Sequence, residues 1–111
     1  MMRVLVIGSP AWNIPVMVHS MLDDWHRRSC FEMTVVHTGT PGAEAQAQEW
    51  AQRPGVDSLV VSTVEAAVSC ADVCLAFIVN QSIREADAVD LCVWAAVPVQ
   101  VFTQWQTVAA R

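Results

Sequence analysis

The sequence contains no lysine, and its charge is low and acidic. All six basic residues are arginine, and the chain has 11 acidic residues, so the formal net charge is −5. Duplex nucleic acid is held mainly through many Lys and Arg contacts to phosphate, and this charge balance argues against a duplex as a partner. With 15% charged and 54% hydrophobic residues, the chain is too apolar to be disordered.

Long hydrophobic runs are absent as well. The longest have seven residues, Val73–Val79 among them, whereas a membrane-spanning helix needs roughly 20. Near the N-terminus only Val4–Ile7 are consecutively apolar before Gly8, which is too short for the core of a secretory signal. We therefore expect a cytoplasmic protein with no membrane partner.

Cysteine and histidine are few, and their spacing matches no metal or redox motif. The four cysteines include no Cys-x-x-Cys pair, and Cys70 and Cys74 have no matching pair of histidines. We interpret the cysteines as reduced thiols of the core. The strand ends described below offer no nucleophile with a base, no carboxylate pair and no metal trio, so we predict no catalytic residue, no metal site and no cofactor.

Two hydrophobic patterns alternate along the chain. Short apolar and β-branched runs have the length of buried strands, and they are Arg3–Gly8, Phe31–His37, Asp57–Val61, Val73–Val79 and Val97–Phe102. Helical spacing separates them, at Ile14–Arg27, Pro41–Gln52, a short segment after Ser62, and Ser82–Ala96. The expected N-caps are Asn13, Thr40 and the Ser-x-x-Glu capping boxes that begin at Ser62 and Ser82.

This alternation predicts one α/β domain over residues 1–111, with residues 103–111 as a C-terminal tail. Strands joined by helices of this length form a mainly parallel sheet, because crossover connections are nearly always right-handed. We expect a Rossmann-like three-layer sandwich, with a five-stranded sheet and helices on both faces. In such folds ligands bind beyond the carboxyl ends of the strands, where the strand order reverses.

The loop after the second strand is the strongest candidate site. It brings two threonine hydroxyls and two glycines to a helix start, where free N–H groups and the helix dipole favour an anion such as phosphate. Turn geometry alone also explains these residue types, and Glu44 either accepts ribose hydroxyls or faces solvent, so both interpretations stay open. The candidate ligand-binding residues here are Thr38, Gly39, Thr40, Gly42, Ala43 and Glu44.

Three other positions at the strand ends have two interpretations each. Gly8-Ser9 closes the first strand, and the glycine either admits a ligand close to the backbone or only permits the turn. Trp12 stacks on a base or packs over the core. His37 is the one histidine at a strand end, and it is either structural or part of a residual catalytic site.

These strand ends resemble a known family pattern. Its motifs are Gly-Ser-Arg-x-Trp, then Gly-Gly-Ala-x-Gly-Ala-Asp before a helix with a Trp-Ala pair, then Phe-x₄-Ser-x-Gly-Thr. The counterparts here are Gly8-Ser9-Pro10-Ala11-Trp12, Thr38-Gly39-Thr40-Pro41-Gly42-Ala43-Glu44 with Trp50-Ala51, and Phe77-Ile78-Val79-Asn80-Gln81-Ser82-Ile83-Arg84-Glu85. The chain thus resembles the SLOG superfamily, which includes the LOG phosphoribohydrolases and DprA, and is most similar to its small YspA-like branch.

The departures from the pattern fall on phosphate-binding positions. Pro10 replaces an arginine, Thr38 a glycine, and Arg84-Glu85 the Gly-Thr of the last motif. Ser82 and Glu85 would satisfy the helix start internally and repel an anion, whereas Arg84 would bind phosphate through its side chain or lie exposed. The LOG glutamate would fall at Ala88, so N-glycosidic hydrolysis is not expected.

The resemblance implies a small non-catalytic domain that binds a nucleotide or nucleotide-derived ligand at the ends of the first, second and fourth strands. It also implies a bacterial or phage setting and a homodimer or higher oligomer. One alternative is a degenerate member whose pocket is lost and which binds proteins through an apolar face around Trp94 and Trp105. The other is a residual nucleotide hydrolase that uses Glu44 or His37.

Overall fold

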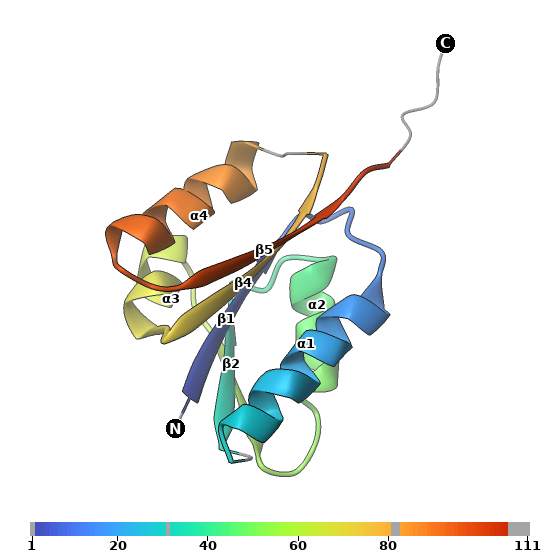
Figure 1. The fold of residues 1–111 in the computed structure, drawn as a ribbon, viewed down its shortest axis with the longest axis vertical. Helices are drawn as coiled ribbons and strands as arrows, with labels where there is room; N and C mark the ends of the chain where they lie inside the picture. The colour runs from blue at the N-terminus through green and yellow to red at the C-terminus, as the bar shows by residue number, and fades with distance from the viewer. Residues whose placement is uncertain (1, 31, 81–82, 107–111) are drawn as a thin grey trace.

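The computed structural model describes residues 2–30, 32–80 and 83–106, with the side chains of residues 83 and 84 left out. Strands and helices alternate along the chain (Figure 1). The strands are β1 (Met2–Gly8), β2 (Met33–His37), β3 (Val56–Val60), β4 (Val73–Val79) and β5 (Val99–Gln104). The helices are α1 (Pro15–Arg28), α2 (Ala43–Trp50), α3 (Val64–Cys70) and α4 (Ile83–Trp94).

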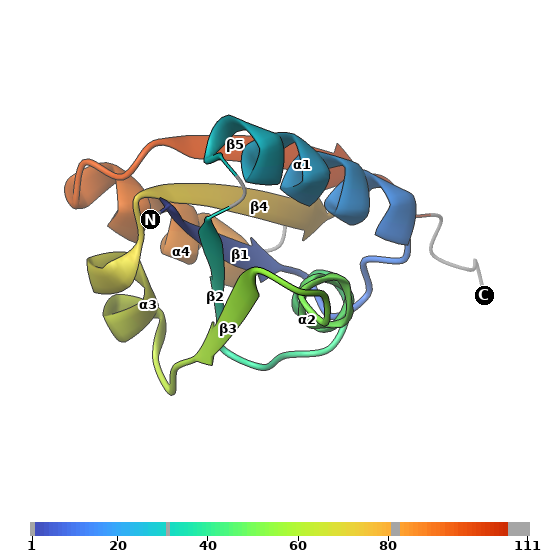
Figure 2. The ribbon, with the colours of Figure 1, turned by 90° about the horizontal axis from the view of Figure 1, so that it is seen from below.

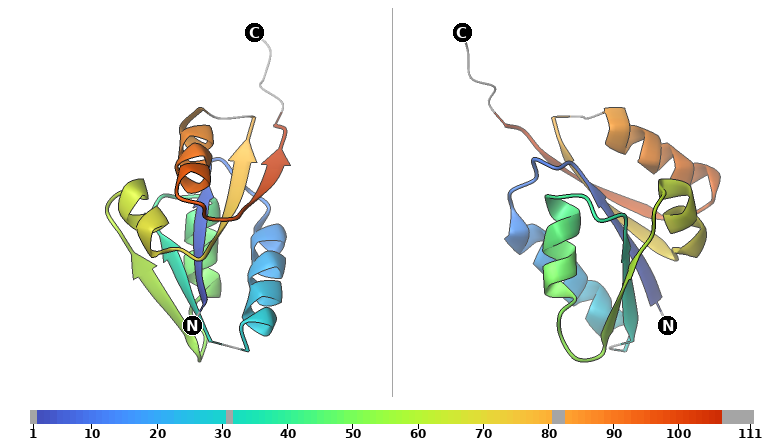
Figure 3. Two further views of the ribbon diagram at one scale, coloured as in Figure 1. Left: turned by 60° about the vertical axis from the view of Figure 1, so that its left-hand side comes forward. Right: turned by 180° about the vertical axis from the view of Figure 1, so that it is seen from behind.

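The five strands form one sheet in the order β3-β2-β1-β4-β5, and each neighbouring pair is parallel. Helices α1 and α2 cover one face, and α3 and α4 cover the other (Figure 3). The predicted Rossmann-like sandwich is therefore confirmed, and its sheet is parallel throughout. The chain builds outward from β1 to β3 and then returns to the other side of β1, so the strand order reverses between β1 and β4.

The two faces of the sheet are packed by different residues. Strand β4 alternates between them: Leu75 and Phe77 point toward α1 and α2, and Cys74 and Ala76 point toward α3 and α4. The α1/α2 face buries the large side chains, and Phe77 lies between Trp12 at 5.1 Å and Phe102 at 5.0 Å between ring centroids. The α3/α4 face is packed mainly by Ala, Val and Cys side chains.

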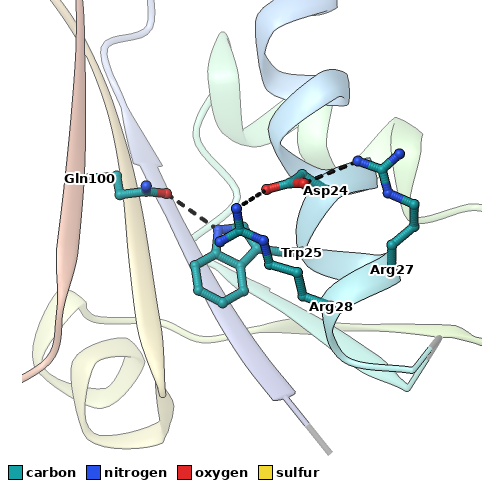
Figure 4. A network of polar contacts seen from close by, with 5 residues as sticks. All are labelled: Asp24, Trp25, Arg27, Arg28 and Gln100. Atoms are coloured by element: carbon teal, nitrogen blue, oxygen red, sulfur yellow. Dashed lines mark hydrogen bonds and ion pairs between the residues drawn. The ribbon is translucent and has the colours of Figure 1, made fainter.

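A polar network joins the C-terminal end of α1 to β5 (Figure 4). Asp24 pairs with Arg27 and Arg28, each at 3.0 Å, and the Arg28 guanidinium lies 5.3 Å from the centre of the Trp25 ring. The indole N–H of Trp25 donates to Gln100 of β5 at 3.4 Å. These exposed ion pairs add little stability individually, but they place two arginines at the amino edge of the sheet.

The starts of the first two helices differ from the prediction. Helix α1 begins at Pro15 with Ile14 as N-cap, because the Asn13 side chain instead accepts a hydrogen bond from Gln104. Helix α2 begins at Ala43 after Gly42, two residues later than expected, because the Thr40 hydroxyl donates to Glu44 instead of capping the helix. In both cases a side chain expected to cap a helix has a different polar partner.

The later elements differ by one or a few residues. Thr63, not Ser62, caps α3, and its hydroxyl accepts from the Ala66 N–H at 3.1 Å. Strand β5 continues to Gln104, so residues 103 and 104 belong to the sheet instead of the tail. Ser82 of the second capping box lies outside the described residues. No helix in the described part of the chain is long and apolar enough to cross a membrane.

Candidate functional site

The carboxyl ends of β1 and β4 are joined by Ser9. Its N–H donates to the Phe77 carbonyl at 2.9 Å, and its hydroxyl accepts from the Val79 N–H at 2.9 Å. The side chain is buried. Ser9, a predicted ligand-binding residue, therefore holds together the two strands between which the strand order reverses.

A small cavity lies beside Gly8 at this point of the sheet, and we call it the switch-point cavity. Its volume of about 20 Å³ has room for about one water molecule. Residues from β1, the β2–α2 loop, α2, α3 and α4 meet around it. They are Ile7, Gly8, Thr38, Glu44, Val64, Glu85 and Ala88. Three of the predicted site residues, Gly8, Thr38 and Glu44, are thus brought together.

Glu44 occupies the position that the sequence suggested for a phosphate. Its carboxylate accepts hydrogen bonds from the Thr38 N–H at 2.6 Å, from the Thr38 hydroxyl at 2.9 Å and from the Thr40 hydroxyl. The side chain is only 3% exposed, so the interpretation that it faces solvent is wrong. Both threonine hydroxyls, expected to meet an anion, donate to an anionic group of the chain itself.

The start of α2 is covered by the loop that follows β1. Gly42 has a φ of +83°, and a Cβ there would collide with the Ser9 carbonyl oxygen and lie 2.8 Å from that of Pro10. Ala43 is fully buried, and a Cβ on Gly8 would lie 2.6 Å from its methyl group. Gly8 and Gly42 are therefore required for close packing of two loops, whatever their role toward a ligand.

His37 is buried and orders the turn that precedes Glu44. Its Nδ1 accepts the Gly39 N–H at 3.1 Å, which places the ring proton on Nε2, 3.3 Å from the Ser58 hydroxyl oxygen. Burial lowers the pKa of His37, although the nearby Glu44 carboxylate opposes this effect. A neutral ring whose basic nitrogen already accepts a hydrogen bond fits the structural interpretation of His37.

Trp12 belongs to the core and not to the edge of the site. It is 2% exposed, its ring meets Phe77 edge to face, and its indole N–H donates to the Ile14 carbonyl at 3.1 Å. The structure therefore agrees with the interpretation that Trp12 packs over the core. Ser82 and the side chain of Arg84, both predicted to contact the ligand, lie outside the described part of the structure.

Glu85 was predicted to cap the helix start and to repel an anion, but it was not among the predicted ligand-binding residues. It is 4% exposed, it lines the switch-point cavity, and its Oε2 has no hydrogen-bond partner in the described structure. The capping-box pattern assigned it a local role at the helix start. Helical spacing carried a different signal, since Glu85, Ala88 and Cys92 fall at i, i+3 and i+7 on the buried side of α4.

The arginines whose side chains are described lie at the amino edge of the sheet, where Asp23, Asp24 and Asp72 also lie. Arg3 near the start of β1, Arg27 and Arg28 at the end of α1, and Arg53 after α2 all belong to the amino edge. Among the described side chains, those that line the switch-point cavity include two carboxylates and no basic group. No group of three or more His, Cys, Asp or Glu side chains among the described residues is arranged to hold a metal ion.

A doubly wound parallel sheet with a polar cavity where its strand order reverses defines a Rossmann-like α/β protein. Residues 2–64, from β1 to the first residue of α3, match the YspA, cpYpsA-related SLOG family, and the chain belongs to that family. It is 30% identical over 118 residues to the Gene 61 protein of Mycobacterium phage D29, covering 89% of this chain and 94% of that protein. No solved structure matches. The resemblance to the YspA-like branch is thereby confirmed.

Proposed function

We propose that this protein binds a nucleotide or nucleotide-derived ligand at the carboxyl ends of β1, β2 and β4 and does not turn it over. The observation that carries the proposal is the switch-point cavity, which lies where Rossmann-like folds bind their ligands. Membership of the SLOG family supports a ligand of this chemical class.

The size of the cavity limits how such a ligand would bind. A volume of about 20 Å³ admits one small group and not a base or a sugar. The body of the nucleotide would therefore lie across the edge of the sheet, and one polar group would reach the carboxylates of Glu44 and Glu85. Recognition would depend on groups that these acceptors favour, such as hydroxyl and amino groups or a cation.

Recognition without turnover is supported by the chemistry around the cavity. Ala88 stands where the resemblance to the LOG enzymes would place a glutamate, and it lines the cavity with a methyl group. His37 is oriented with its protonated nitrogen toward Ser58, so it does not act as a base toward that hydroxyl.

Thermal unfolding with mononucleotides, NAD and cyclic dinucleotides tests the proposal. A ligand present at 100 times its Kd raises the free energy of unfolding by about 2.7 kcal/mol. We expect Thr38→Val to weaken the affinity at least about tenfold, because it removes a hydroxyl at the cavity wall. Thr103→Val, the same change at an exposed position of β5, is the matched control. If none of these nucleotides stabilises the protein, the proposal is wrong.

Protein binding is a second candidate function, favoured by two exposed tryptophans. Trp94 is 88% exposed and Trp105 is 68% exposed. They do not form one face, because Trp94 ends α4 just before β5 begins and Trp105 follows the far end of that strand. Six strand residues separate the two positions by about 20 Å. Each tryptophan would therefore serve a separate contact.

A further inference from the structure

The two buried glutamates at the switch-point cavity differ in what they bind. The oxygens of Glu44 accept three hydrogen bonds from Thr38 and Thr40. The Oε2 atom of Glu85 is buried and has no hydrogen-bond partner in the described structure. A buried carboxylate oxygen without a partner is costly, and a bound donor or cation offsets that cost.

The surroundings of this pair favour a cation as the missing partner. Two carboxylates from different helices, α2 and α4, line a space the size of one water molecule, and among the residues whose side chains are described no basic one lines it with them. The neighbouring His37 is kept neutral by burial, which lowers its pKa. Like charges that line one small cavity repel each other in a region of low dielectric constant, and a cation between them reverses the sign of that interaction.

We propose that Glu44 and Glu85 together bind one divalent cation of the Mg²⁺ type in the switch-point cavity. The donor set consists of carboxylate oxygens, which suit Mg²⁺ or Mn²⁺ better than zinc or copper. Mg²⁺ is commonly held by one or two protein carboxylates, and water and phosphate oxygens complete its shell. Two protein ligands are therefore sufficient, and a third acidic or histidine ligand is not required.

The cation gives the carboxyl edge a way to accept an anionic ligand. A phosphate placed directly at this cavity would face two carboxylates, whereas a phosphate oxygen on the cation would be attracted. This step rests on the proposed function: the nucleotide would bind as its Mg²⁺ complex. Binding of the cation alone does not depend on it.

Mn²⁺ alone is the first probe, because it is paramagnetic and replaces Mg²⁺ at oxygen sites. In amide NMR spectra of the wild-type protein, substoichiometric Mn²⁺ should broaden the signals of Gly8 and Thr38 first. Signals of Met2 and Cys30, at the opposite edge of the sheet, should stay sharp, and excess Mg²⁺ should restore the broadened ones. Uniform broadening over the acidic surface, or no broadening of Gly8 and Thr38, would overturn the inference.

Glu85→Gln tests the contribution of the unpartnered carboxylate. We expect the affinity for Mn²⁺, measured by titration calorimetry, to fall at least about tenfold. Glu49→Gln, the same change on an exposed position of α2, should leave it unchanged. Without metal, Glu85→Gln should unfold at or above the wild-type temperature, because it removes an unpaired buried charge. Equal Mn²⁺ affinity in Glu85→Gln and wild type would contradict the site, and Glu85→Ala provides the same test if the first variant does not fold.

The same measurements separate this inference from the proposed function. If nucleotides stabilise the protein equally in Mg²⁺ and in EDTA, and Mn²⁺ does not broaden the signals of Gly8 and Thr38, the cation site is wrong and the nucleotide site stands. If Mn²⁺ binds at Gly8 and Thr38 but none of the nucleotides stabilises the protein, the cation site stands and nucleotide binding is wrong. If nucleotides bind only with Mg²⁺, and Glu85→Gln abolishes that dependence, both are supported.

Discussion

The two faces of the sheet are formed by the same strands but are packed by different kinds of side chain. On the α1/α2 face, Trp12, Trp50, Phe77 and Leu22 are buried and fill the space between helices and strands. On the α3/α4 face, the side chains are mainly alanine, valine and cysteine, and the switch-point cavity opens among Ile7, Val64 and Ala88 of that side. Figure 2 shows the strands in sequence from β5 at the top to β3 at the bottom, with α3 at the left and α2 at the right.

The packing of the two faces indicates where the fold gains most of its stability and where it leaves space for polar side chains. Large aromatic side chains bury the most apolar area per residue, so the α1/α2 face contributes most of the packing free energy. Small side chains on the other face leave room for Glu44 and Glu85 to meet from α2 and α4. A fold of this size can thus accommodate two buried carboxylates, because the close packing of the α1/α2 face stabilises the domain as a whole.

The largest effect is expected on the aromatic side of the sheet. Phe77→Ala should lower the free energy of unfolding by about 3–5 kcal/mol, because it leaves a cavity between Trp12 and Phe102. Urea unfolding measures this directly. Ile78→Val, one residue along on the α3/α4 face, should cost only about 0.5–1.5 kcal/mol. Similar costs for the two variants would refute the contrast between the faces.

A second variant pair tests the close contact between the loops that follow β1 and β2. Gly42→Ala should cost about 2–4 kcal/mol, because it combines an unfavourable positive φ with a clash against the backbone of Ser9 and Pro10. Gly39→Ala has a similar φ of +86°, but its Cβ would make only an ordinary contact at 3.6 Å from Val60 Cγ1, so a loss of about 1–2 kcal/mol is expected. The same clash makes Gly42→Val unsuitable for probing ligand binding, since it would disturb the fold. Equal losses of free energy of unfolding in the two alanine variants would show that the backbone around Gly42 moves to admit the added methyl group.

The element order and the fold class were predictable from the sequence, because both depend on local patterns. Val73–Val79 is a continuous apolar run with the length of a strand covered on both faces, and β4 has the same bounds and is buried throughout. Helix starts were less predictable. Where α2 begins depends on contact between Gly42 and the loop at Ser9 and Pro10, more than 30 residues away in the sequence.

The candidate site was predictable in place but not in chemistry. The carboxyl ends of β1 and β2 are where parallel folds bind ligands, and Gly8, Thr38 and Glu44 do lie together there. The hydrogen bonds of Glu44 were not foreseen, because the Thr40 hydroxyl had two possible partners that local sequence does not distinguish. Glu85 was predicted as a capping and anion-repelling residue but not as a ligand-binding one, because a capping pattern and a buried helix position coincide at the same residue.

The pH dependence of stability tests whether His37, beside the switch-point cavity, is held neutral. His37→Asn should lower the free energy of unfolding by about 1–2 kcal/mol at pH 7.5, through loss of the bond to Ser58 and of packing. In the wild type the folded pKa lies below the unfolded value of 6.5, so the unfolded chain takes up a proton first. Stability should therefore fall as pH decreases from about 6.5 toward the folded pKa.

The His37→Asn variant has no histidine at this position, so its stability does not change with pH for this reason. The difference in free energy of unfolding between wild type and variant should therefore become smaller as pH decreases. Urea unfolding of both proteins between pH 7.5 and pH 5 gives the measurement. A difference that stays constant over this range would show that His37 is not held neutral by its surroundings.

The smallest effect is expected at the exposed tryptophans, outside both cores. Trp94→Ser should change the free energy of unfolding by less than about 0.5 kcal/mol, because the side chain is 88% exposed and leaves no buried space when removed. Trp50→Ser, a buried tryptophan on α2, should cost several times more, about 3–5 kcal/mol. Unfolding at two protein concentrations is the decisive measurement. If Trp94→Ser removes a concentration-dependent part of the wild-type stability, this tryptophan lies in an interface between copies, and the protein-binding function gains over nucleotide recognition.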